Sequence, residues 1–179
     1  MLPQRINLIA YSTLAVIICY IDRVNISVAI IPMQEQFGWS DSQVGFIFSS
    51  FYLGYMLTMA LGGYLSDKFG GKRVLGWGVV LWSIFTILTP LAAHNGFFAL
   101  FFIRILMGIG EGVTFPAWHS LYARWIPFNE RTRAIAFTNS GVSVGTIIGY
   151  IGTQMIILAM GWEWAFYIFG IVGLVWFIF

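Results

Sequence analysis

The chain has 179 residues, of which 59% are hydrophobic and only 9% are charged, and its formal net charge is +2. A soluble domain carries about 25% charged residues, so this composition excludes an ordinary soluble fold and favours an integral membrane protein. The single cysteine, Cys19, excludes a disulfide framework within one chain.

Six apolar stretches are long enough to cross a bilayer, since a spanning helix needs about 20 mostly apolar residues. We predict an all-α membrane protein whose spans cover residues 6–31, 44–64, 74–93, 97–123, 134–160 and 162–179. The predicted linkers carry breaker and turn residues at Pro32, 38–42, 70–71, 94–96, 127–129 and Gly161. The runs are too long, and alternate too little, for the strands of a membrane barrel.

The positions of lysine and arginine predict the orientation. All the cations outside the spans lie in the amino-terminal segment and in the second and fourth linkers. They are Arg5, Lys68, Lys72, Arg73, Arg124, Arg131 and Arg133. Cationic loops stay in the cytoplasm, so we expect both chain ends on the cytoplasmic side of an inner or plasma membrane. These loops also suit acidic lipid heads, although topology alone explains them.

The first span contains two adjacent ionisable residues, Asp22 and Arg23. A charged group at the centre of a membrane helix costs roughly 3 kcal/mol on insertion scales and usually has a function. Neighbours on a helix point about 100° apart, so this pair cannot simply neutralise itself. Arg23 instead shares a face with Tyr20 and Cys19.

The second span carries a tyrosine, Tyr55, and leads into a short basic segment. This segment contains Gly63, Asp67, Lys68, Gly70, Lys72 and Arg73. Glycine permits close helix approach and tight turns, and the cations hold the segment on the inner side.

The fourth span places Arg104, Gly108 and Glu111 at i, i+4 and i+7, which puts both charges on one helix face. Pro116 removes a helix hydrogen bond just past Glu111 and predicts a kink there. A rise of about 1.5 Å per residue brings Asp22 and Arg104 to comparable depths, with Glu111 nearer the middle. The four groups therefore predict one shared polar cavity, and structural ion pairs are the alternative interpretation.

The remaining spans carry weaker signals. Glycines at 141, 145, 149 and 152 favour tight helix packing in the fifth span. The sixth span ends in apolar sequence at Phe179, which leads us to expect a truncated sixth helix and a missing second half.

His94 and His119 lack partners at metal-ligand spacing, so we predict no metal site. No nucleotide-binding loop is present, and we expect neither an ATP-driven pump nor a nucleic-acid partner.

Three motifs resemble known sequences. The segment 63–73 (GYLSDKFGGKR) resembles the signature loop between the second and third helices of the major facilitator superfamily. The first-span run YIDRVN at 20–25 and the fourth-span run RILMGIGEG at 104–112, followed by TFPA, resemble the anion:cation symporters of that superfamily. That family contains sugar-acid and hexuronate symporters, phthalate permeases, sialin and the vesicular glutamate transporters. The resemblance implies that residues 1–179 are the amino-terminal six-helix half of a major facilitator fold.

The resemblance also implies roles for individual residues. Asp22 and Glu111 match the protonation sites of sugar-acid symporters. Tyr20, Arg23 and Tyr55 match residues that contact substrate or line the cavity. Arg104 matches an arginine that interacts with the protonatable groups, and Asn139 is a weaker substrate-binding candidate.

We therefore expect a secondary active transporter, not an enzyme, that moves a small organic anion together with a proton or sodium ion by alternating access. No other cofactor is expected. Two arginines on one cavity suit a carboxylate substrate, because the guanidinium fork matches it. The alternatives are a membrane sensor or scaffold with the same fold, and a proton-coupled exporter of the same superfamily. An intramembrane enzyme would need a nucleophile–base pair or a metal cluster, and neither is visible.

Overall fold

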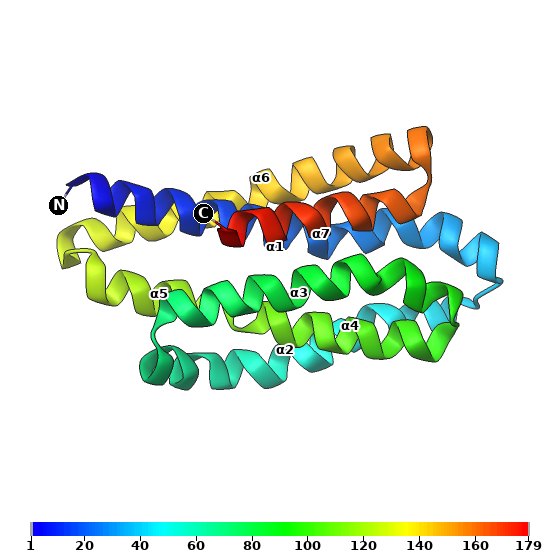
Figure 1. The fold of residues 1–179 in the computed structure, drawn as a ribbon, viewed down its shortest axis with the longest axis horizontal. Coiled ribbons are helices and arrows are strands. Elements are labelled where there is room, and N and C mark those ends of the chain that lie inside the picture. Colours follow the sequence, from blue (N-terminus) through cyan, green and yellow to red (C-terminus); the bar gives the residue numbers. More distant parts are fainter. Residues whose placement is uncertain (1, 179) are drawn as a thin grey trace.

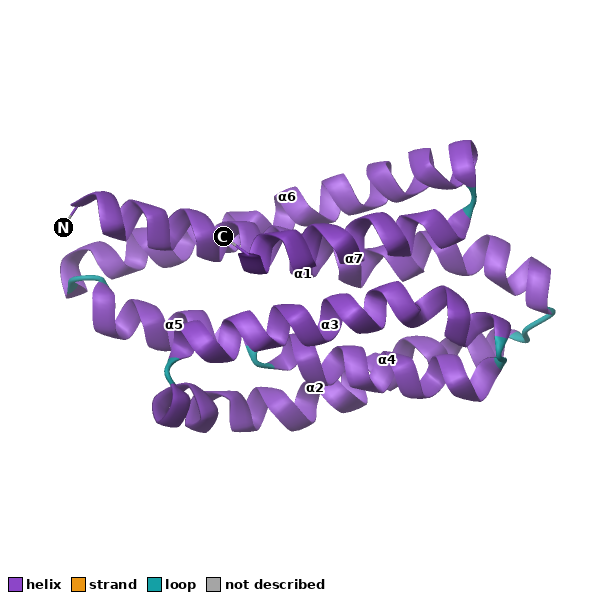
Figure 2. Cartoon of the chain, viewed as in Figure 1, coloured by secondary structure: helices purple, strands orange, loops and turns teal. Residues whose placement is uncertain are grey.

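The computed structural model describes the backbone of residues 2–178 and the side chains of residues 4–178. Within this range the chain forms helices joined by short turns, with no strands (Figure 2). The helices are α1 (Leu2–Phe37), α2 (Asp41–Phe69), α3 (Gly71–His94), α4 (Phe97–Gly112), α5 (Thr114–Trp125), α6 (Phe128–Met160) and α7 (Trp162–Ile178). Phe179, the predicted end of the sixth span, lies outside the described residues.

The prediction of six helical spans is confirmed, since α4 and α5 together form the fourth span. Five spans are long and apolar enough to cross a membrane, with the fourth running from Phe97 to Trp125. The sixth, α7, is apolar but shorter, at 17 residues. The fold is therefore an all-α bundle, as the composition indicated.

One predicted linker is wrong, and another is shorter than predicted. Pro32 lies inside α1, which continues to Phe37; a proline near a helix end removes one backbone hydrogen bond, and Met33 is fully buried beyond it. The basic segment is almost entirely helical, because α2 continues to Phe69 and α3 starts at Gly71. Only Gly70 lies between them, with φ of +87°, a value that side chains disfavour.

At the predicted kink, the fourth span is interrupted at one residue. Val113 separates α4 from α5 three residues before Pro116. Proline has no N–H and clashes with the preceding turn, so the carbonyl of Gly112 has no helical partner at that position. Glu111 therefore lies at the end of a helix in the middle of the span.

The helices pack in pairs that repeat after the third span (Figure 1). Helix α2 packs on α4 as α1 packs on α6, and α3 packs on α7. This pairing pattern matches the three-helix repeats of opposite topology known in transporter halves. The first helix of each repeat, α1 or α4, carries the intramembrane charges.

Glycines permit the closest helix contacts. A Cβ atom on Gly145 would lie 2.5 Å from the carbonyl oxygen of Ile17, and one on Gly141 would lie 3.1 Å from that of Thr13. A Cβ on Gly108 would overlap the backbone of Phe51. The predicted packing role of the fifth-span glycines is confirmed for the α1–α6 contact.

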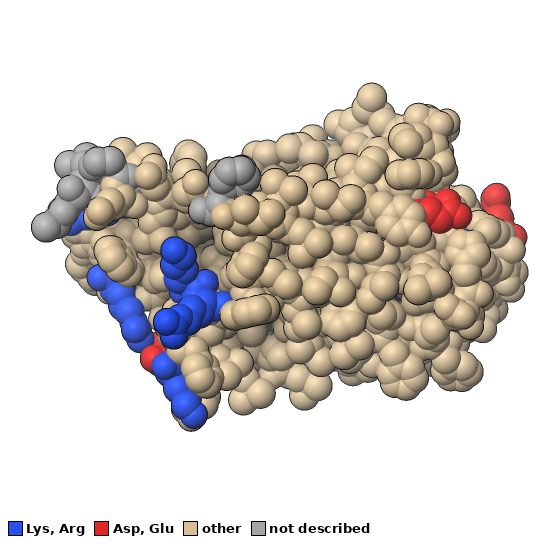
Figure 3. All heavy atoms as spheres, viewed as in Figure 1, with Lys and Arg blue, Asp and Glu red and all other residues tan. Residues whose placement is uncertain are grey.

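The charges outside the spans are segregated along the bundle. Figure 3 shows the lysines and arginines near the end that holds the amino terminus, with acidic atoms among them, and further acidic side chains but no cations at the opposite end. The cation-rich end includes the turn between α2 and α3 and the start of α6, where Arg5 lies 3.6 Å from Glu130. The segregation fits the predicted orientation of the helices.

Candidate functional site

A buried ion pair joins the first and fourth spans. The Arg23 guanidinium donates from Nε and Nη2 to one carboxylate oxygen of Glu111, at 3.0 and 2.9 Å. Glu111 has no exposed surface, whereas the Arg23 side chain keeps 15%. The second oxygen of Glu111 has no hydrogen-bond partner among the described side chains. Both bonds from Arg23 therefore go to one oxygen of Glu111, and the other oxygen could accept a further hydrogen bond.

The thiol of Cys19 and three aromatic rings complete the surroundings of Arg23. Cys19, one turn earlier in α1, donates its thiol to the bound oxygen of Glu111 at 3.3 Å. The guanidinium carbon of Arg23 lies 4.7 to 5.1 Å from the ring centres of Tyr20, Phe51 and Tyr55. Cation–π contacts of this kind fix a cation where water is scarce.

Arg104 lies in the same region without a carboxylate partner. Among the described residues, it makes no ion pair with an acid. Its Nη1 lies 3.1 Å from the sulfur of Met107, its guanidinium faces Phe51 at 5.0 Å, and its Nε is unpartnered. A buried guanidinium with so few acceptors leaves a cation available for an anionic ligand.

Among the described residues, Asp22 makes no ion pair with Arg23 or Arg104. It is fully buried, and within the described chain its carboxylate accepts one hydrogen bond, from the indole Nε1 of Trp82 on α3, at 3.1 Å. Its other carboxylate oxygen has no partner among the described side chains. The two acids therefore have different surroundings, although the sequence predicted one shared polar cavity for both.

A hollow of about 360 Å³ opens beside the two arginines. Its wall comes from α1, α2, α4 and α6, and it exposes polar and apolar atoms in similar measure. The lining residues are Tyr20, Arg23, Val24, Ile26, Ser27, Phe48, Phe51, Tyr52, Arg104, Thr146 and Tyr150. Two guanidinium groups, three phenols and two aliphatic hydroxyls can bind a small anion that also has hydroxyl groups.

A neighbouring hollow of about 470 Å³ shares Tyr20 with the first. Tyr55 lines this second hollow rather than the first, together with Met59, Phe115, Pro116 and His119. The ring of Tyr55 still faces Arg23 at 4.7 Å, and Tyr20 lies between the two hollows.

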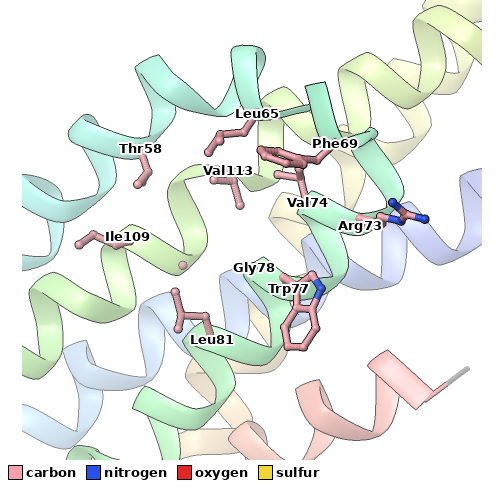
Figure 4. A pocket seen from close by; sticks show the side chains of 11 residues that line it. Thr58, Leu65, Phe69, Arg73, Val74, Trp77, Gly78, Leu81, Ile109 and Val113 are labelled. Carbon is pink, nitrogen blue, oxygen red and sulfur yellow. The ribbon is translucent and has the colours of Figure 1, made fainter. Parts of the chain in front are cut away.

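A third hollow, of about 390 Å³, lies between α2, α3 and α4 (Figure 4). Apolar side chains such as Leu65, Trp77 and Ile109 dominate its wall, and Arg73 lies at one edge. None of the four intramembrane ionisable residues lines it. It is a lateral groove of the bundle, and we do not assign the site to it.

The remaining predicted residues lie away from the ion pair. Asn139 is exposed on α6 and lines none of these hollows, but it shares a helix face with Thr146 and Tyr150 at spacings of seven and eleven. Its position is about 10 Å along the helix from Thr146 at 1.5 Å per residue.

The basic segment forms its own contacts at the cation-rich end. Asp67 accepts from Arg124 at 3.4 Å, and both side chains are exposed. Lys68 lies over the rings of Tyr64 and Phe69. A Cβ on Gly63 would meet nothing within 4 Å in the described chain, so the close approach expected there does not involve these helices.

Several site residues were missing from the sequence prediction. Ser27 is four residues after Arg23, so the face shared by Tyr20 and Arg23 could have indicated it. Tyr52, Thr146, Tyr150 and Trp82 have no local signal, since only tertiary packing brings them to the charges.

Known proteins are similar to this chain over nearly its whole length. Residues 12–179 match the family model described as Major Facilitator Superfamily. The chain is 46% identical to an ascorbate transporter, chloroplastic, of Arabidopsis thaliana, over 98% of its own length and 32% of the relative. It is 47% identical to a probable anion transporter 4, chloroplastic, of Oryza sativa subsp. japonica, over 98% of the chain and 30% of the relative. A sodium-dependent phosphate transport protein 1, chloroplastic, of A. thaliana is 45% identical over 97% and 34%.

Solved structures match over nearly the whole chain. A bacterial homolog of the human lysosomal transporter Spinster, inward-facing and occupied, superposes with a TM-score of 0.83 at 26% identity, covering 98% of this chain and 43% of that one. A D-xylose-proton symporter gives 0.82 at 20% identity, over 95% and 46%, and shows the shared fold. The chain spans about a third of the length of the curated relatives it matches. It belongs to the Major Facilitator Superfamily, as the amino-terminal six-helix half of that fold.

Proposed function

We propose that this chain is half of a secondary active transporter that carries a small organic anion together with a proton. The observation that carries the proposal is the buried Arg23–Glu111 pair, which lies beside an unpaired Arg104 on the wall of a hollow. The relatives named as ascorbate, phosphate and anion transporters support an anionic cargo.

The geometry supports a specific exchange of partners. When Glu111 takes a proton it loses its charge, and the two bonds from Arg23 weaken because they are charge-assisted. Arg23 and Arg104 can then hold a carboxylate of the substrate from two sides of the hollow. Loss of the proton restores the ion pair, and the substrate loses a binding partner. Proton and anion therefore bind together.

The route across the membrane requires a second half. We propose that a carboxy-terminal six-helix unit closes the open side of the hollow, with α2 and α6 presenting apolar faces to it or to lipid. Rocking of the halves would expose the site to each side in turn. The protein is then an integral membrane carrier, with both ends of this segment in the cytoplasm.

Replacement of Glu111 by glutamine tests the coupling. In proteoliposomes that contain the chain with its carboxy-terminal half, we expect Glu111→Gln to abolish anion accumulation driven by a pH gradient. Exchange of labelled anion across the membrane should persist, because the neutral amide of the variant no longer holds Arg23 by charge. Uptake of labelled ascorbate and glucuronate, with and without the gradient, measures both.

Replacement of Glu163 by glutamine is the matched control. Glu163→Gln changes an acid at the start of α7, outside the site, and should leave accumulation unchanged. Undiminished accumulation in Glu111→Gln would remove Glu111 from the coupling role. Accumulation that follows a sodium gradient instead of pH would assign sodium as the coupling ion. Saturable binding without flux in the native protein would favour the sensor alternative.

A further inference from the structure

Asp22 is the least explained ionisable residue of the site. It is adjacent to Arg23 in sequence but does not line the hollow of the two arginines. Its carboxylate has no exposed surface, and its one hydrogen bond comes from Trp82. A buried carboxylate held by a single neutral donor is costly, so that donor determines how the charge is tolerated.

Trp82 is held rigidly by helix packing. Its side chain is fully buried in a cluster with Cys19, Phe51, Val79 and Met107. A Cβ on Gly110 would lie only 2.8 Å from the backbone nitrogen of Trp82, so α3 and α4 touch there through their main chains. The indole N–H therefore has a fixed direction, and it points at Asp22 across the α1–α3 contact.

Contacts continue from Trp82 to Arg104. The carbonyl oxygen of Trp82 accepts the hydroxyl of Thr86 at 2.9 Å. That hydroxyl lies 3.8 Å from the sulfur of Met107, and the same sulfur is 3.1 Å from Nη1 of Arg104. Helix α3 thus bridges the acid of α1 and the unpaired cation of α4, although α3 supplies no charge of its own at this depth.

We propose that Trp82 is the positioning residue for Asp22, and that its indole N–H binds the ionised carboxylate and is released when Asp22 is protonated. The bond weakens on protonation, because a hydrogen bond to a charged acceptor is roughly twice as strong as one to a neutral acceptor. The hydrogen bond between α3 and α1 then depends on the charge of Asp22. This hydrogen bond does not depend on the proposed function, whereas its effect on transport rests on that function.

Other ionisable groups of the same buried region also act on Asp22. These are Cys19 on α1 and Arg104 and Glu111 on α4; Arg23 on α1 and Tyr55 on α2 lie in the same region, facing each other. The test must therefore separate the response of Trp82 to Asp22 from its response to Glu111.

Fluorine NMR of the protein labelled with 5-fluorotryptophan tests the hydrogen bond without transport. The Trp82 resonance is assigned by its loss in Trp82→Phe, or by its displacement in Asp22→Asn if the first variant does not fold. We expect this resonance to move between pH 5 and 9 in the native protein and in Glu111→Gln, and to stay constant in Asp22→Asn. A flat native resonance, or an unchanged titration in Asp22→Asn, would overturn the assignment.

Trp118 is the matched control. It is also fully buried, and its indole nitrogen has no hydrogen-bond partner among the described residues. Its fluorine resonance should not depend on Asp22, and Trp118→Phe removes an N–H that holds nothing. A Trp118 resonance that follows Asp22 as closely as Trp82 does would indicate a global change instead of this bond.

Transport measurements then test the consequence. Trp82→Phe keeps the aromatic ring but removes the N–H, and we expect about tenfold slower pH-driven uptake with a displaced pH profile, since bonds to charged groups are strong. In an Asp22→Asn background the same change should have no further effect, whereas Trp118→Phe should leave uptake within twofold. Additive losses would overturn the positioning role. If the native protein transports nothing, the proposed function fails while the NMR result still decides the hydrogen bond.

Discussion

The guanidinium of Arg23 is bound in two different ways at once. Two of its nitrogens donate to the same oxygen of Glu111, and three aromatic rings surround its carbon. A planar, delocalised cation satisfies both kinds of contact, and an ammonium group does not. The identity of this cation should therefore matter as much as its charge.

Arg23→Lys tests this requirement. We expect at least a tenfold loss of transport rate, because one of the two charge-assisted bonds, worth about 1.5–3 kcal/mol, cannot be made by a single ammonium. The measurement is initial uptake in proteoliposomes, with Arg133→Lys at the start of α6 as the control that keeps native rates. Native activity in Arg23→Lys would show that charge alone is sufficient.

The sequence was informative about which residues are ionisable at membrane depth, and less so about their partners. Spacing placed Arg104 and Glu111 on one face and separated Asp22 from Arg23. It could not show that Glu111 binds Arg23 while Asp22 binds Trp82, because those choices depend on how α1 is rotated against α3 and α4. The rotation of α1 about its axis is determined by packing along the whole helix, so a local sequence pattern does not predict it.

At the scale of single helices, glycine determines how closely α2 and α4 approach. Gly54 of α2 lies against the backbone of Ile105, and Gly108 of α4 lies against that of Phe51. Close backbone approach replaces side-chain interdigitation in membrane helix pairs. The contact also fixes the height of Glu111, one turn beyond Gly108, relative to α1.

Gly108→Ala should therefore destabilise the bundle by about 1–3 kcal/mol, the usual cost of overpacking. The midpoint of thermal unfolding in detergent measures the effect. Gly45→Ala, in the same helix pair but with open space around its Cβ, should be neutral or slightly stabilising, since alanine favours a helix. Equal midpoints for the two variants would contradict the assigned close contact.

Element boundaries show where sequence patterns fail. Pro32 and the 63–73 segment both suggested loops, and both are helical apart from Gly70. Packing extended α1 past Pro32, because a single lost hydrogen bond near a helix end costs less than the burial of Met33 gains. The one-residue interruption at Val113 was indicated by Pro116.

At the scale of the whole molecule, charge segregation gives the bundle a direction. The cations gather at the end with the amino terminus (Figure 3), and the turn between α3 and α4 at the far end has no lysine or arginine. Cationic loops remain in the cytoplasm. The number of spans and this asymmetry were both evident from the sequence, since they depend only on composition along the chain.

Cysteine labelling checks this orientation. With the protein in a bacterial inner membrane, Asn95→Cys should react with a membrane-impermeant maleimide in intact spheroplasts, whereas Asn129→Cys should react only after lysis. Both asparagines are exposed at opposite ends of the bundle, and the native Cys19 is fully buried and serves as the unlabelled background. Reversed labelling would invert the assigned topology.

The Arg23–Glu111 bond has a consequence for biogenesis. Both partners belong to the first four spans, so their charges are neutralised by segments that leave the ribosome early. A polypeptide as long as the relatives would have most of its length still to be synthesised at that moment. The insertion machinery can then release these polar helices into lipid as a matched set, without retaining them until later segments arrive.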